Sequence, residues 1–333
     1  MSRVAKAAVG LMAATLVAKI LGFGRELALA SAYGASGVSD AFLVAMNIPA
    51  VIFTAIGTSL GTAFIPLYCE VNANKGEQSS NKFTNNVFNI VVIICIVISV
   101  IGAIFTPQIV KIFAVGFEGE TLRLAIYFTR VMILGLAFLG MSYIMMAYLQ
   151  VKENFIIPGF MSVPYNILII ISIIVSVKIS PYLLPWGTLI GLSLQFLFQL
   201  PFAIKKGYRY KLYIDVKDEH LKRMLWLIAP VLIGVAVNQI NTIVDRTIAS
   251  TLVEGSISAL NYATKLNQFV MGMFIVSISS VVYPMLSKLS SENNKEQFNK
   301  SIITSVNTVT LLVIPISIGA IILANPIVKL LFQ

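Results

Sequence analysis

The sequence predicts an all-α polytopic membrane protein. Of its 333 residues, 58% are hydrophobic and only 11% are charged, and the mean hydropathy is +0.89. A soluble domain has roughly 25% charged residues. The apolar residues form long runs rather than the alternating ten-residue segments of a barrel, so we expect the membrane-spanning segments to be helices.

Apolar runs of about 20 or more residues predict nine transmembrane helices. These cover residues 4–31, 38–68, 84–112, 121–149, 155–177, 183–204, 221–250, 257–287 and 301–324. Several runs exceed 25 residues, which indicates helices that tilt, kink or protrude from the bilayer. The first run continues past Lys19 and Arg25 without a clear small-residue cleavage site, so we expect a retained span and not a signal peptide.

The distribution of lysine and arginine predicts a cytoplasmic N-terminus. With that orientation, fifteen of these residues lie at the inner ends of the spans and four at the outer ends, namely Lys111, Arg123, Lys178 and Lys329. Such a bias follows the positive-inside rule, which explains the net charge of +10 without nucleic acid as a partner. Seven of the fifteen lie in residues 205–223, an aromatic and basic segment that we expect to lie along the anionic inner leaflet.

An internal repeat relates the first part of the chain to the last part. Residues 98–113 (ISVIGAIFTPQIVKIF) resemble residues 316–332 (ISIGAIILANPIVKLLF), and their IVK triplets are 218 residues apart. Pro66 and Pro284 lie in similar surroundings at the same spacing. Six spans separate the copies, so both have the same orientation, as in transporters built from parallel repeats.

The repeat divides the chain into three expected parts. Residues 1–206 form a six-helix lobe, residues 207–220 a cytoplasmic amphipathic linker, and residues 221–333 the first three helices of a second lobe. Three further helices would complete that second lobe, so we expect a lobe that is incomplete in this chain.

The first span carries the most informative ionisable residues, in LVAKILGFGRELALASAYGASGVSDAF. Charges within a bilayer are costly, so Lys19, Arg25, Glu26 and Asp40 must pair or face a water-filled cavity. Gly22 and Gly24 favour a local unwinding or hinge that would let Lys19 and Arg25 converge and leave N–H groups free for an anion. The alternative is that Arg25 only pairs with Glu26 or Asp40 and holds helices together.

A third cation is expected at the same cavity if the two lobes are pseudo-symmetric. Lys265 in the eighth span would then face Lys19 and Arg25, and three cations suit a diphosphate. The alternative is a lysine that extends to the membrane interface. Arg130 in the fourth span is expected to be a structural pair or an interface anchor.

The seventh span offers candidate ligands for a coupling cation. Asp245 lies near Asn241 and Asn238 on one helix, and their oxygens suit a cation such as Na+. A salt bridge from Asp245 to Arg25 or another cation is equally compatible with the sequence. Cys69, Cys95 and His220 form no metal-ligand pattern, and the sequence lacks a phosphate loop or nucleophile motif, so we expect neither an enzyme nor a cofactor.

Four segments resemble the MurJ (MviN) lipid II flippase family of the multidrug/oligosaccharidyl-lipid/polysaccharide exporter superfamily. They are AKILGFGRELALASAYGASGVSDAFLVAMNIP, INTIVDRTIAS, GSISALNYATKLNQF and SSVVYPMLSK. The resemblance implies fourteen spans and a central cationic cavity for the diphosphate and sugar headgroup of lipid II. The family's cavity arginines correspond to Lys19, Arg25 and Lys265, and its aspartate to Asp40. Two of these arginines are lysine here, which keeps the charge without the bidentate fork.

The resemblance therefore implies a flippase of the bacterial cytoplasmic membrane that moves lipid II outward by alternating access. Lys19, Arg25 and Lys265 would bind the diphosphate, while Glu26 and Asp40 would position these cations or gate the cavity. Coupling would come from Na+ or the membrane potential, and the partners would be lipid II, membrane lipids and cell-wall synthesis proteins. The segment from Phe53 lacks the family's RRxFAEGA residues. The alternatives are a flippase for another polyprenyl-diphosphate-linked oligosaccharide, a drug or cation exporter, and a truncated membrane scaffold that transports nothing.

Overall fold

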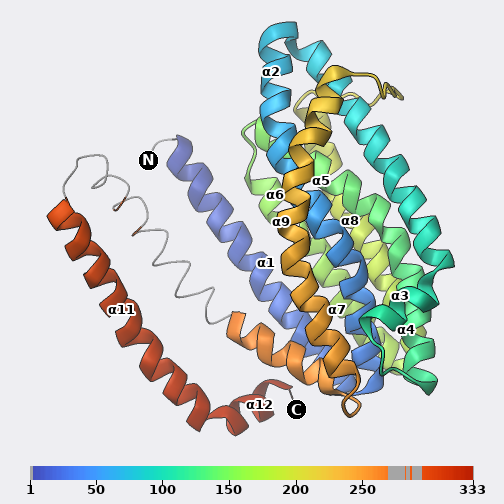
Figure 1. The fold of residues 1–333 in the computed structure, drawn as a ribbon, viewed down its shortest axis with the longest axis vertical. Helices are drawn as coiled ribbons and strands as arrows, with labels where there is room; N and C mark the ends of the chain where they lie inside the picture. The colour runs from blue at the N-terminus through green and yellow to red at the C-terminus, as the bar shows by residue number, and fades with distance from the viewer. Residues whose placement is uncertain (1–2, 269–281, 283–285, 287–294, 333) are drawn as a thin grey trace. The chain divides into compact units, whose positions relative to one another are not determined.

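The computed structural model of the chain describes residues 3–268, 282, 286 and 295–332 (Figure 1). All of the regular secondary structure in these residues is helical, which confirms the predicted all-α class. The chain divides into two compact units, Met1–Ser258 and Ala259–Gln333.

The first unit contains the helices that form the predicted spans one to seven. The long helices are α1 (Arg3–Tyr33), α2 (Gly37–Ile104), α5 (Leu136–Val151), α7 (Ser162–Lys178), α8 (Leu184–Lys205) and α9 (Glu219–Ser250). Shorter elements complete the spans: α3 (Thr106–Phe113), α4 (Gly119–Met132), η1 (Ile133–Gly135), α6 (Ile156–Phe160) and η2 (Pro181–Leu183).

The predicted second and third spans are joined by helix instead of by a polar loop. Helical structure continues through residues 69–83, and only Gly76 leaves the helical region, with φ of 77° and ψ of 175°. This positive φ suits glycine, which has no Cβ to clash. The two halves of α2 pack against each other, since the rings of Phe64 and Phe83 stack with centroids 5.7 Å apart. The chain therefore folds back between these two predicted spans within helical structure, at Gly76.

Six of the described helical stretches are long and apolar enough to cross a membrane. They are Leu60–Ile104, Gly119–Val151, Ile156–Lys178, Pro181–Lys205, Glu219–Ser250 and Glu296–Ile322, with Gly37–Val51 as a shorter apolar helix. The chain is thus a multi-pass membrane protein. The count of nine spans and the cytoplasmic N-terminus stay predictions.

Two apolar clusters form the interior of the first unit. One joins Phe64 and Tyr68 in α2 to Tyr148 in α5. The other joins the first turns of α2 to α4 and to the end of α9. Its buried residues include Ala249 of α9 and Ile257, which follows α9 in the chain. Because α9 packs along α2 (Figure 1), the compact unit extends past residue 206, where the first lobe was expected to end.

The second unit contains the end of a helix that reaches residue 268, followed by α11 (Lys295–Ile322) and α12 (Ala324–Phe332). The rings of Tyr262 and Phe332 stack within it, with centroids 5.0 Å apart. Most of the predicted span 257–287 lies outside the described residues. The short helices α3 and α12 begin at Thr106 and Ala324, which are 218 residues apart, so the break between a long and a short helix recurs at the repeat spacing.

The linker after α8 packs against α2, and its expected place along the inner leaflet stays a prediction. Residues 208–215 form no helix and run along α2, held by asparagine side chains. Asn81 Nδ2 donates to the Gly207 carbonyl (3.2 Å), Asn85 Nδ2 to the Arg209 carbonyl (2.8 Å), and Asn89 Nδ2 to the carbonyls of Lys211 (3.2 Å) and Tyr213 (3.0 Å). Asn86 continues the series, with bonds to the backbone carbonyl and N–H of Asp215.

The rise of the helix over four residues matches the advance of the extended linker over two residues, which explains the regular spacing of the asparagine bonds. Four residues of helix rise about 6.0 Å, and two residues of extended chain advance roughly 6.6 Å. An asparagine at every fourth position of α2 therefore meets the carbonyl of every second linker residue. The Tyr208 hydroxyl also donates to Asn85 Oδ1 at 3.0 Å. Burial raises the pKa of Tyr208 far above its ordinary value, so this hydroxyl remains protonated.

Candidate functional site

A cavity of about 350 Å³ lies among the helices of the first unit. Residues of α1, α2, α4, α5, α7 and α8 line it, and about half of them are polar. The polar lining residues are Arg25, Thr54, Tyr143, Ser162, Tyr165, Asn166, Thr188 and Gln195. Arg25 is the charged residue among them, so the cavity has a cationic wall and no lining aspartate or glutamate among the described residues.

The Arg25 side chain is held in place by three neighbours. Its Nη2 donates to Glu26 Oε1 at 2.6 Å, and its Nη1 donates to Asn166 Oδ1 at 3.3 Å. The guanidinium carbon lies 6.0 Å from the centre of the Tyr165 ring. With 15% of its side chain exposed, Arg25 is paired yet still reaches the cavity, so the two alternatives for this residue are compatible.

Glu26 has a 3% exposed side chain and lies in the field of two arginines. It forms the ion pair with Arg25 and interacts electrostatically with Arg246 of α9. Arg246 Nη1 in turn donates to the Leu43 carbonyl at 3.5 Å. A buried carboxylate between two guanidinium groups stabilises the charged form of both arginines.

Lys19, Gly22 and Gly24 lie on a continuous helix. Helix α1 runs without interruption from Arg3 to Tyr33, so the unwinding expected at the two glycines is absent from this conformation. Lys19 is exposed and does not belong to the cavity lining. Because no break brings Lys19 and Arg25 together, the convergence of these two cations is wrong here, and the hinge stays a prediction.

Asp40 lies in the first turn of α2 and holds the segment that follows α9. Its Oδ2 accepts from the Gly255 N–H (2.7 Å), and its Oδ1 accepts from the Ser258 N–H (2.7 Å) and the Ser258 hydroxyl. The carboxylate thus caps the helix that begins after Gly255. Asp40 does not line the cavity of Arg25, so its role in substrate binding stays a prediction.

The two halves of the repeat meet at this contact. Asp40 and Ser258 are 218 residues apart, the spacing of the repeat, and Gly37 and Gly255 are equivalent in the same way. A Cβ on Gly37 would lie 1.9 Å from Glu254 Oε1, and a Cβ on Gly255 would lie 2.4 Å from the Ala35 carbonyl oxygen. Gly255, which has φ of 90° and meets backbone atoms, is therefore required for the close approach of the two loops, whereas a Cβ on Gly37 would displace the Glu254 side chain.

The remaining predicted residues are less closely tied to the cavity. Asp245 and Asn241 are exposed on α9, and the Asn238 side chain lies outside the described part of the chain. No group of three or more His, Cys, Asp or Glu among the described residues is placed to hold a metal ion. Lys265 belongs to the second unit, so its approach to Arg25 stays a prediction. Arg130 is exposed in α4.

Sequence reasoning missed Tyr165, Asn166 and Arg246 as partners of the charges in α1. Arg246 was visible as an ionisable residue within a span, and such residues must find partners. Tyr165 and Asn166 gave no comparable signal, since a tyrosine and an asparagine near a helix start are common in any membrane protein.

The fold defines the class of protein first. A solved structure titled an inward-facing multidrug resistance MATE family transporter of the MOP superfamily matches with a TM-score of 0.72 over 98% of this chain and 75% of its own, at 14% identity. This likeness shows the transporter fold alone.

The family follows from closer matches. The model of the family Lipid II flippase MurJ matches residues 29–333, and the chain belongs to that family. A solved structure titled lipid II flippase MurJ, inward closed conformation, has a TM-score of 0.82 and 30% identity over 97% of this chain and 67% of its own. The probable lipid II flippase MurJ of Buchnera aphidicola subsp. Acyrthosiphon pisum is 30% identical over 96% of this chain and 64% of its own length. The lipid II flippase MurJ of Burkholderia cenocepacia is 28% identical over 96% and 64%.

The chain thus spans 64 to 65% of the length of these curated relatives. The membership confirms the predicted family.

Proposed function

We propose that this chain moves lipid II from the inner to the outer leaflet of the bacterial cytoplasmic membrane by alternating access. The single observation that carries the proposal is the placement of Arg25 in the wall of an internal cavity of a chain that belongs to the MurJ family. A guanidinium donates paired hydrogen bonds to phosphate oxygens, which suits the diphosphate of a lipid-linked sugar. Lys19 and Lys265 would add charge to this site in another conformation.

The closed end of the first unit supports an alternating-access cycle. The loops around Asp40 and Ser258 are joined by three hydrogen bonds at the end of α1 and α9. With the N-terminus in the cytoplasm, this end faces outward, and opening it would release the headgroup outside. The energy for the cycle would come from the membrane potential, about 2.3 kcal/mol per charge per 100 mV, or from Na+.

The polarity of the cavity favours an anionic substrate over the runner-up, a drug or cation exporter. A cationic drug needs acidic residues, and the described lining residues include none. The diphosphate of another polyprenyl-linked oligosaccharide would bind Arg25 equally well, so Arg25 does not select the sugar of the substrate. Chemistry at the substrate is not required for this transport, and cell-wall synthesis proteins would be the partners that use its product.

The experiment is a flipping assay with fluorescent lipid II in vesicles that contain the chain, its Arg25→Ala variant or its Arg223→Ala variant. Arg223 is the matched control, because it is an exposed arginine outside the cavity, paired with Glu70 at 2.8 Å. Removing a charge-assisted phosphate contact worth about 1.5–3 kcal/mol should slow flipping by about tenfold or more, while the control retains the wild-type rate. Wild-type flipping no faster than in protein-free vesicles, or full activity of Arg25→Ala, would contradict the proposal.

A further inference from the structure

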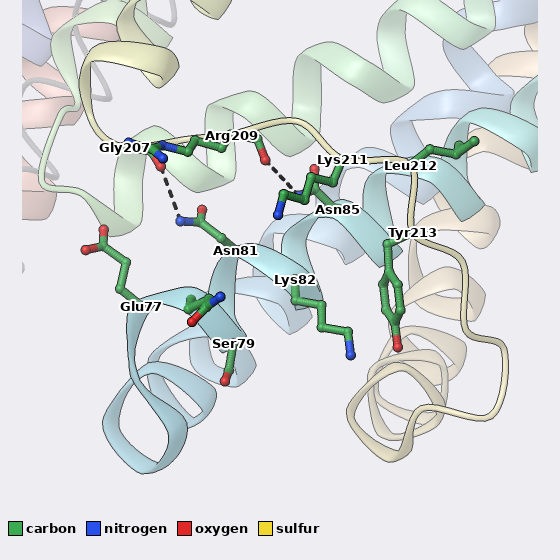
Figure 2. Close-up of a pocket in the computed structure, with 11 residues that line it drawn as sticks. Glu77, Ser79, Asn81, Lys82, Asn85, Gly207, Arg209, Lys211, Leu212 and Tyr213 are labelled. Carbon is green, nitrogen blue, oxygen red and sulfur yellow. Dashed lines mark hydrogen bonds between the residues drawn. The ribbon is translucent and has the colours of Figure 1, made fainter.

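A second and larger hollow, about 760 Å³ in volume, lies between α2 and the linker that follows α8 (Figure 2). The linker is fixed there by the asparagine series of α2, so the hollow has a defined wall. Figure 2 shows two of these bonds, from Asn81 to Gly207 and from Asn85 to Arg209. The function proposed above does not use this hollow.

Three cations line this hollow, namely Lys82, Arg209 and Lys211. None of them has a carboxylate partner within ion-pair distance among the described residues. Glu77 is the acidic group of the lining, and its carboxylate is already paired with Lys152. The lining therefore carries a surplus of positive charge that an anion would neutralise.

The Tyr213 ring orients the ammonium group of Lys82. Lys82 Nζ lies 4.4 Å from the centre of the Tyr213 ring, and Figure 2 shows the two side chains next to each other at one edge of the hollow. A cation–π contact orients the ammonium group without neutralising it. Lys82 thus remains available to an anionic ligand.

The hollow lies where two predicted spans meet water. The predicted span 84–112 begins just after Lys82, and the apolar helix Pro181–Lys205 ends just before Gly207. Its lining also includes Leu212, 77% of which is exposed, and the next apolar residues of the linker, Ile214 and Val216, are 47% and 66% exposed. Exposed apolar side chains beside cations are typical of a surface at the membrane interface.

We propose that this hollow binds the phosphate headgroup of an anionic phospholipid such as phosphatidylglycerol. The three cations bind the phosphodiester, Gln78 and Ser79 offer polar groups to the headgroup hydroxyls, and the exposed apolar residues of the linker contact the acyl chains. A soluble phosphate compound would not use the apolar residues. A bound lipid would also hold the linker against α2, because it contacts both.

The test is lipid binding by the full chain in detergent, measured by native mass spectrometry with phosphatidylglycerol and with phosphatidylcholine of the same acyl chains. One variant carries Lys82→Gln, Arg209→Gln and Lys211→Gln together. The matched control carries Lys205→Gln, Lys206→Gln and Lys217→Gln, which removes three cations from or beside the same linker outside the hollow. All six side chains are exposed, so both variants should fold, as circular dichroism would verify.

We expect the chain to prefer phosphatidylglycerol and the variant of the hollow to bind it about tenfold or more weakly, with the control unchanged. Three results would overturn the proposal. The two lipids bind equally, the control loses as much affinity as the variant of the hollow, or millimolar inorganic phosphate displaces the lipid, which would identify a site for free phosphate instead. None of these results depends on whether the chain flips lipid II.

Discussion

The contact between Asp40 and Ser258 allows a quantitative prediction. The Asp40 carboxylate is 3% exposed and accepts three hydrogen bonds, two from backbone N–H groups and one from the Ser258 hydroxyl. Hydrogen bonds to charged groups contribute about 1.5–3 kcal/mol, and buried donors left without an acceptor cost about 1–3 kcal/mol each. Removing the carboxylate also removes the free-energy cost of burying its charge, and this gain offsets part of the lost stability. We therefore expect Asp40→Ala to lower the free energy of unfolding by about 3–5 kcal/mol.

Ser258→Ala removes only one donor and should cost about 1–2 kcal/mol. The assay is equilibrium unfolding in mixed micelles, followed by circular dichroism, for a double-mutant cycle of Asp40→Ala and Ser258→Ala. We expect a coupling free energy of about 1–2 kcal/mol, since the two substitutions remove the same bond. The matched control is a cycle with Ser256→Ala, whose hydroxyl donates only to the Val253 carbonyl. Additivity of Asp40 and Ser258 within about 0.5 kcal/mol would refute the reasoning.

Two further predictions concern α1 and the linker. Nothing lies within 4 Å of a Cβ built on Gly22 or Gly24, so replacing both by alanine should stabilise α1 by about 1–2 kcal/mol in thermal unfolding. If the glycines act as a hinge, the same double variant should flip lipid II more slowly, and an unchanged rate would remove the hinge. Asn89→Ala leaves the carbonyls of Lys211 and Tyr213 without a donor. We expect faster trypsin cleavage after Lys211, while Asn74→Ala, an exposed residue of the same helix, should leave cleavage unchanged.

The sequence predicted the helices well because apolar length decides where a chain crosses a membrane. It did not predict that residues 69–83, which lie between two predicted spans, are helical. Those residues remain helical because a single glycine, Gly76, makes the turn within the helix. The path of the linker could not be predicted for a different reason. Its conformation depends on asparagine side chains of α2 more than 120 residues away, and no local pattern in residues 207–218 contains that information.

The candidate site was predicted only in part. Features visible within one span were identified, whereas contacts with distant segments were not. Arg25 and Glu26 were identified because charges within a span are conspicuous. Two of the three partners of Arg25, Tyr165 and Asn166, and the capping role of Asp40 depend on segments at least 140 residues further along the chain. The repeat contained a clue to the second of these, since a spacing of 218 residues separates Asp40 from its partner.

That spacing explains why the contact joins two different residues. After duplication, equivalent positions start with the same side chain, and positions close to a two-fold axis face their own copies. Two carboxylates at 40 and 258 would repel each other, and two serines would form a weaker bond. An aspartate at one position and a serine at the other gives an acceptor and a donor at the same place, with the Ser258 N–H as a second donor. The difference between the two equivalent positions therefore gives this end of the first unit a strong bond, and exchanging the two residues should restore part of the stability that either single substitution to alanine removes.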